Sequence, residues 1–112
     1  VDVQVVHGGR FTPADNLAVA ESGASISFAP WAELRGLLGY PQEIVVAGVT
    51  TDCCVLSTAL PACDDGVHVT VVADASAGVT EMDHQRALDV MALYSPLIDV
   101  ADVDSVLASL AK

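Results

Sequence analysis

Residues 43–73, EIVVAGVTTDCCVLSTALPACDDGVHVTVVA, carry the clearest structural signal in the chain. They begin with an apolar run, 43–48, which is typical of a strand buried on both faces of a sheet. Residues 51–63 then have the composition of a helix that ends at the turn DDG of residues 64–66, where glycine suits a left-handed cap. The β-branched run 67–73 predicts a second strand. A strand, a helix and a strand joined by short turns predict parallel strands with a right-handed crossover.

The same alternation continues on both sides of this stretch. Apolar residues at helical spacing, a candidate N-cap at Thr80 and a break at Pro96 predict a helix over residues 80–94. The other expected elements are a helix at 31–38, a strand at 97–100, a helix at 103–110 and candidate strands at 1–6 and 24–28. Together they predict an α/β fold, a parallel doubly wound sheet with helices on both faces, in a single domain over residues 1–112.

The composition argues against several classes of partner. The 112 residues hold 15 acidic and 4 basic side chains, which gives a formal net charge of −11. A nucleic-acid binder needs a basic surface, and an anionic membrane repels an acidic chain. No apolar run approaches the roughly 20 residues of a membrane-spanning helix, and no signal peptide is expected. Three cysteines, an odd number, favour a reducing, cytoplasmic location over a disulfide framework.

Two adjacent cysteines, Cys53 and Cys54, follow the first of these strands. In an open α/β sheet, sites lie at the carboxyl ends of strands, where helices begin. The positive end of a helix dipole favours the thiolate form of a cysteine in the first turn, and backbone N–H groups there can hold an oxyanion. These features indicate a cysteine nucleophile. The alternative is that both cysteines are small buried apolar residues, the commoner role of a cysteine thiol.

A series of short motifs runs in order from this turn toward the C-terminus. The motifs are GVTTDCCVLSTA at 48–59, DG at 65–66, VADA at 72–75 with Gly78, and His84 with Ala87 and Leu88. This series resembles that of the isochorismatase-like cysteine hydrolases, and the resemblance covers residues 26–112. It implies the three-layer, Rossmann-like fold of that family. It also implies action on a small molecule, through an amide or a vinyl ether as in nicotinamidases and isochorismatases, without a cofactor.

The resemblance implies roles for individual residues. Cys54, immediately before Val55, is the implied nucleophile, and Cys53 is its neighbour at a position that the family leaves variable. The bond between Val49 and Thr50 is implied to be a cis peptide. The N–H groups of Thr50 and Cys54 then face the substrate oxyanion.

The family also uses an aspartate base and a lysine. Asp2, within the sequence VDVQ of residues 1–4, matches the aspartate of the family's first strand. A second alignment makes residues 1–6 a later strand and Asp2 an ordinary surface residue. The lysine has no counterpart near the expected site, because Lys112 is the only lysine of the chain.

Two classes of function therefore stay open. The first is a cysteine hydrolase of non-peptide C–N bonds that works through a thioester-like acyl-enzyme. The second is a catalytically impaired, isochorismatase-like interaction or scaffold protein, which the missing lysine favours. A homo-oligomer is expected, because a chain shorter than its relatives leaves apolar surface uncovered. His84 is expected to be a partly exposed structural residue, and the 3 histidines predict no metal site.

Overall fold

The apolar and β-branched runs form parallel strands in the structure, a computed structural model that describes residues 5–6 and 31–110. In this part of the chain a four-stranded sheet has the order β1-β2-β3-β4, and each neighbouring pair is parallel. The strands are β1 (Val5–Val6), β2 (Glu43–Val49), β3 (His68–Ala77) and β4 (Ile98–Ala101). The parallel strands predicted from the three apolar runs are thereby confirmed.

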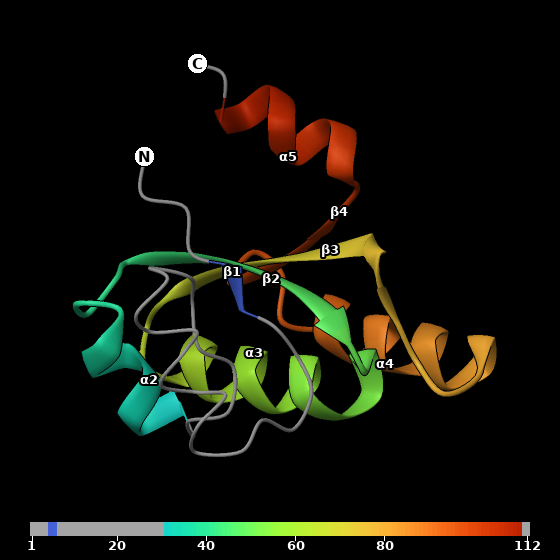
Figure 1. The fold of residues 1–112 in the computed structure, drawn as a ribbon, viewed down its shortest axis with the longest axis horizontal. Helices are drawn as coiled ribbons and strands as arrows, with labels where there is room; N and C mark the ends of the chain where they lie inside the picture. Colours follow the sequence, from blue (N-terminus) through green and yellow to red (C-terminus); the bar gives the residue numbers. More distant parts are fainter. Residues whose placement is uncertain (1–4, 7–30, 111–112) are drawn as a thin grey trace, which may run out of the picture.

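Helices cover both faces of this sheet (Figure 1). Among the described helices, α2, α3 and α4 lie on one face and α5 lies on the other. Their bounds are α2 (Trp31–Leu37), α3 (Leu56–Asp64), α4 (Glu81–Ala92) and α5 (Val103–Leu110). The predicted α/β class is confirmed, and the candidate strand at 24–28 lies outside the described residues. None of the described helices has the length and apolar character needed to span a membrane.

One face of the sheet forms the hydrophobic core with α2, α3 and α4. Ile44, Val69 and Ile98 lie in register across β2, β3 and β4, and each is at most 2% exposed. Helix side chains pack against them, among them Leu34, Ala59, Ala62, Leu88 and Met91. This burial specifies the register of the sheet, because a slip of one residue turns every strand side chain to the opposite face.

The helix predicted over residues 51–63 does not begin as an ordinary α-helix. Thr51–Val55 form a π-helical turn, η1, and α3 follows it directly. The Thr50 carbonyl oxygen accepts hydrogen bonds from the backbone N–H groups of Cys53 and Val55, both at 3.1 Å. The second bond spans five residues, which widens the turn, and such turns occur frequently at functional sites. Apolar periodicity does not reveal this local widening, so the sequence predicted one continuous helix.

Asp65, in the turn between α3 and β3, connects α2 to the rest of the fold. Its Oδ2 accepts hydrogen bonds from Trp31 Nε1 at 2.7 Å and from Arg35 Nη1 at 2.9 Å. The ion pair with Arg35 is half-exposed and contributes little to stability. Trp31 is only 5% exposed, so its indole N–H depends on this carboxylate.

Asp65→Ala is expected to lower the free energy of unfolding by about 1–3 kcal/mol, because it leaves the buried indole N–H of Trp31 without its acceptor. Asp65→Asn keeps an acceptor oxygen and is expected to lose less. Urea unfolding followed by the fluorescence of Trp31, the 1 tryptophan of the chain, measures both variants. Equal stability of Asp65→Ala and the wild type would contradict this account of α2.

Candidate active site

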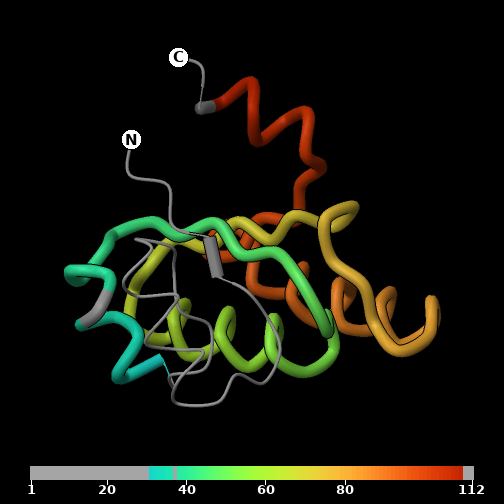
Figure 2. The backbone as a smooth tube through the Cα atoms, in the orientation of Figure 1, coloured from blue at the N-terminus to red at the C-terminus, as the bar shows by residue number. Residues whose placement is uncertain are grey.

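The strands β2 and β3 end side by side at one edge of the sheet. Gly48 pairs with Ser76 and Val49 with Ala77, so the two carboxyl ends are adjacent. Figure 2 shows the chain leaving both ends toward α3 and α4 on the same face of the sheet. Ligands of open α/β sheets bind at such strand ends. The two cysteines follow the end of β2, as the sequence predicted.

The last residues of β2 have an irregular backbone. The register with β3 shifts between Val46 and Gly48, and Gly48 has a φ of 122°, which glycine adopts far more readily than other residues. The Val49–Thr50 peptide bond is cis, the geometry that the family resemblance implies. The role of Val49 and Thr50 in holding an oxyanion stays a prediction.

Cys54 lies half-buried in η1, and Cys53 is exposed. Thr58 Oγ1 donates a hydrogen bond to the Cys54 carbonyl oxygen at 2.9 Å. The backbone N–H groups on either side of Cys54, those of Cys53 and Val55, both donate to the Thr50 carbonyl oxygen. These two N–H groups are therefore engaged within the turn, and the N–H groups of Thr50 and of Cys54 itself are the ones predicted to face an oxyanion.

Cys63, in the last turn of α3, has different surroundings. It is 4% exposed. Burial raises the pKa of its thiol, and the charge of Asp64 raises it further. A protonated thiol is a poor nucleophile. The sequence left open that the adjacent cysteines are small buried apolar residues. Cys63 is such a residue, whereas Cys53 is exposed.

α4 brings a buried histidine to the same edge of the sheet. His84 Nδ1 and Thr51 Oγ1 lie 2.6 Å apart, and the two residues are 8% and 0% exposed. The expectation that His84 is partly exposed is therefore wrong. Its spacing contained the signal, because His84 precedes the buried residues Ala87, Leu88 and Met91 by three, four and seven positions, which places it on the same helix face.

Gly78, in the loop between β3 and α4, allows these segments to approach closely. A Cβ atom on Gly78 would lie 2.8 Å from His84 N and 3.1 Å from Asp52 Oδ1. This Asp52 oxygen is buried and has no hydrogen-bond partner in the described part of the chain. Glycine is required at this position by close contact with the backbone of α4 and with η1.

Gly78→Ala is expected to lower the free energy of unfolding by about 1–3 kcal/mol, because the added methyl group overlaps the backbone of His84. Gly36→Ala is the matched control. Its Cβ would meet Tyr40 Oη at 3.9 Å, an ordinary contact, within α2, where alanine is the better helix former. Thermal unfolding of both variants tests the difference, and equal loss of stability would contradict the close approach at Gly78.

Two groups that the family uses, an aspartate base and a cation, have no assigned counterpart among the described residues. Asp2 lies outside the described residues, so its role as a base stays a prediction. The described arginines pair with carboxylates, Arg35 with Asp65 at 2.9 Å and Arg86 with Asp83 at 3.9 Å. Within the described ranges, no three His, Cys, Asp or Glu side chains gather closely enough to hold a metal ion.

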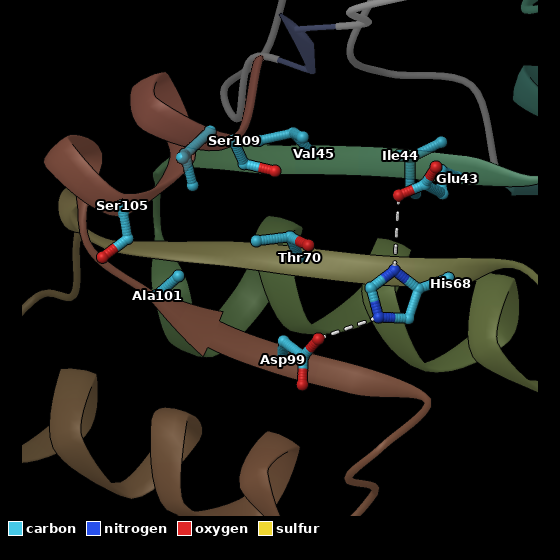
Figure 3. Close-up of a pocket in the computed structure, with 10 residues that line it drawn as sticks. Glu43, Ile44, Val45, His68, Thr70, Asp99, Ala101, Ser105 and Ser109 are labelled. Atoms are coloured by element: carbon cyan, nitrogen blue, oxygen red, sulfur yellow. Dashed lines mark hydrogen bonds and ion pairs between the residues drawn. The ribbon is translucent and has the colours of Figure 1, made fainter. Parts of the chain in front are cut away.

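A hollow of about 310 Å³ lies on the other face of the sheet, beneath α5 (Figure 3). His68 is one of its lining residues, with Nε2 2.9 Å from Asp99 Oδ2 and Nδ1 3.7 Å from Glu43 Oε1. Glu43 and His68 are the first residues of β2 and β3, whereas Cys54 follows the end of β2. The hollow is therefore remote from the Cys54 thiol. The cysteine turn is the candidate active site, because it holds the expected nucleophile.

Comparison with known proteins identifies the family. The isochorismatase domain model matches residues 33–102, which include β2, the cysteine turn, β3, α4 and β4. This match covers more than half of the chain, and the chain belongs to the isochorismatase family. No curated protein sequence matches it.

Solved structures show the same fold. A MAR1 ribonuclease from Caenorhabditis elegans is 17% identical, with a TM-score of 0.67, and the match covers 93% of this chain and 58% of that one. YcaC from Escherichia coli, described as an octameric hydrolase of unknown specificity, is 23% identical, with a TM-score of 0.61 and coverage of 89% and 54%. The nicotinamidase PncA from Bacillus subtilis is 22% identical, with a TM-score of 0.56 and coverage of 82% and 56%. The chain thus spans little more than half the length of these proteins.

Proposed function

We propose that this chain is a cysteine hydrolase that acts on a small amide or a related substrate, with Cys54 as its nucleophile. The observation that supports the proposal is the turn after β2, where a half-buried thiol lies at the beginning of a helix. The Thr50 carbonyl oxygen holds the N–H groups on both sides of that thiol. Membership of the isochorismatase family and the nicotinamidase among the structural neighbours support the same chemistry.

The proposed reaction has two stages. Cys54 Sγ attacks the amide carbonyl carbon, and the thiol proton passes to a base, for which Asp2 is the candidate. Negative charge forms on the carbonyl oxygen, where the N–H groups of Thr50 and Cys54 stabilise it. The C–N bond then breaks, the amine leaves with a proton, and a thioester remains on Cys54. Water hydrolyses the thioester, which releases the acid and restores the thiol.

Incubation of the purified chain with nicotinamide, a carbamoyl amide and isochorismate tests the proposal. Product formation is followed directly, and intact-mass measurement detects an acyl adduct. We expect slow product formation from one of the three, because the family uses a lysine at the site and the only lysine of this sequence is Lys112. Failure of all three substrates to yield product or adduct would contradict the proposed activity.

A second candidate function is that of a catalytically impaired family member that binds a partner or serves as a scaffold. The observation that favours it is the pairing of the described arginines, because Arg35 and Arg86 both contact carboxylates elsewhere. A missing donor to the developing oxyanion costs about 3 kcal/mol of transition-state stabilisation. The same substrate panel separates the two functions, since a scaffold protein is inactive on every substrate.

We also propose that the chain forms a homo-oligomer, as the octameric YcaC does. Large apolar side chains are exposed on α4 and in the segments before and after it, namely Val79, Met82, Leu93 and Leu97. Exposed apolar surface of this kind is commonly covered by association. Sedimentation of the purified chain at micromolar concentration is expected to show a dimer or a larger assembly. A stable monomer under these conditions would contradict the proposal.

The acidic composition of the chain argues against a nucleic-acid partner. One structural neighbour is named a ribonuclease, and that name describes the neighbour and not this chain. The sequence has 4 basic residues and a net charge of −11, too few basic side chains for the surface that binds phosphate backbones, so we propose a small-molecule substrate and no nucleic-acid partner. A cytoplasmic location, away from any membrane surface, fits the same composition and the cysteines without a disulfide framework.

A further inference from the structure

A buried hydrogen bond that the proposed reaction does not use holds the thiol-bearing turn. Thr51 Oγ1 and His84 Nδ1, 2.6 Å apart, join η1 to α4 across 33 positions of sequence. Both residues are buried. Removing one partner of a buried hydrogen bond leaves the other unsatisfied, so the geometry of this contact is strongly maintained.

Thr51 is well placed to orient Cys54. It is the first residue of η1, three positions before Cys54, and its carbonyl oxygen accepts a hydrogen bond from the N–H of Leu56. On the other side of the thiol, Thr58 Oγ1 donates to the Cys54 carbonyl oxygen. Cys54 therefore lies between two threonines whose hydroxyl groups are hydrogen-bonded. The partner of Thr51 is His84, which belongs to a different helix.

Gly78 packs closely against the beginning of α4 and against η1. A Cβ atom at this glycine would already lie 2.8 Å from His84 N and 3.1 Å from Asp52 Oδ1. The backbone of His84 therefore lies in a closely packed region beside η1. A residue at position 84 that lacks a polar atom at the place of Nδ1 leaves the Thr51 hydroxyl without this partner.

From these contacts we propose that His84 is a positioning residue for the nucleophile. Through the Thr51 hydroxyl it fixes η1 so that Cys54 Sγ and the Cys54 N–H face the same substrate carbonyl. His84 does not touch the substrate in this scheme. The inference rests on the proposed function in taking Cys54 as the nucleophile. Misplacement of a reacting group by about 1 Å can reduce a rate by about a hundredfold.

The test measures alkylation of Cys54 by iodoacetamide near neutral pH, which requires no substrate. Thr51→Val keeps the shape of the side chain and removes the hydroxyl, and His84→Leu removes Nδ1. Each is expected to slow alkylation of Cys54 by at least about tenfold, because the reactivity of a thiol depends on the groups that the fold holds around it. Thr51→Ser and His84→Asn, which restore a hydroxyl and a polar atom near the place of Nδ1, are expected to return the rate to within about threefold of wild type.

Asp65→Ala serves as the control for lost stability, because it weakens the fold at the far end of α3 and leaves η1 untouched. Its Cys54 alkylation rate is expected to stay at the wild-type value. Wild-type alkylation in folded Thr51→Val and His84→Leu, or equal slowing in Asp65→Ala, would overturn the proposal. If His84→Leu does not fold, the nearly isosteric Thr51→Val decides the question with Thr51→Ser. Alkylation that follows the expected pattern without turnover of any substrate would contradict the proposed function alone.

Discussion

Cys54→Ala is expected to lower the turnover of any accepted substrate by at least about a thousandfold, because no acyl-enzyme can form without the thiol. The side chain is half-buried in η1, so its removal changes little of the core. The fold is expected to persist, and the loss then reports on chemistry alone. Initial rates on the best substrate of the panel, together with intact-mass detection of the adduct, measure the effect.

Cys53→Ala is the matched control for this variant. It makes the same substitution one position earlier in the same turn, at an exposed side chain. We expect this variant to keep most of the wild-type activity. The assignment of the nucleophile would be wrong if Cys54→Ala stayed active, or if Cys53→Ala were the variant that lost the adduct.

The strands and most helices are predictable from the sequence because local patterns specify them. The apolar runs that form β2 and β3 have the composition of strands buried on both faces, and the register places Ile44 beside Val69 in the core. α5 begins at Val103 and ends at Leu110, as its pattern predicts. The π-helical turn at Thr51–Val55 was missed, because a single carbonyl that accepts two N–H groups leaves no mark on apolar periodicity.

The candidate site was predictable only in part, for a physical reason. The position of Cys54 follows from the succession of a strand and a helix along the chain, since a thiol between the two lies at the edge of the sheet. The contact between Thr51 and His84 depends on how α4 packs against η1, and no pattern within either segment specifies it. The need for glycine at position 78 arises from the same packing.

Cys63 is expected to be alkylated at least about a hundredfold more slowly than Cys54 under limiting iodoacetamide near neutral pH. Cys63 is buried, so the reagent reaches it only when the fold opens locally. Burial, with the charge of Asp64, raises the pKa of its thiol. Each unit of such a rise lowers the thiolate fraction about tenfold. Cys53 is exposed and accessible but is not the proposed nucleophile, so its alkylation rate is expected to lie between those of the other two.

Cleavage before aspartate residues releases the peptide DCCVLSTALPAC, residues 52–63, in which fragment ions separate all three thiols. Labelling of Cys63 is expected to increase as the pH rises, because the thiolate forms only as the pH approaches its raised pKa. In Cys53→Ala the fast phase is expected to remain, since it belongs to Cys54. Labelling of Cys63 ahead of Cys54 would contradict both the burial of α3 and the assignment of the nucleophile. Fast labelling confined to Cys53 would contradict only the assignment of Cys54 as the nucleophile, because Cys53 would then be the most reactive thiol of the turn.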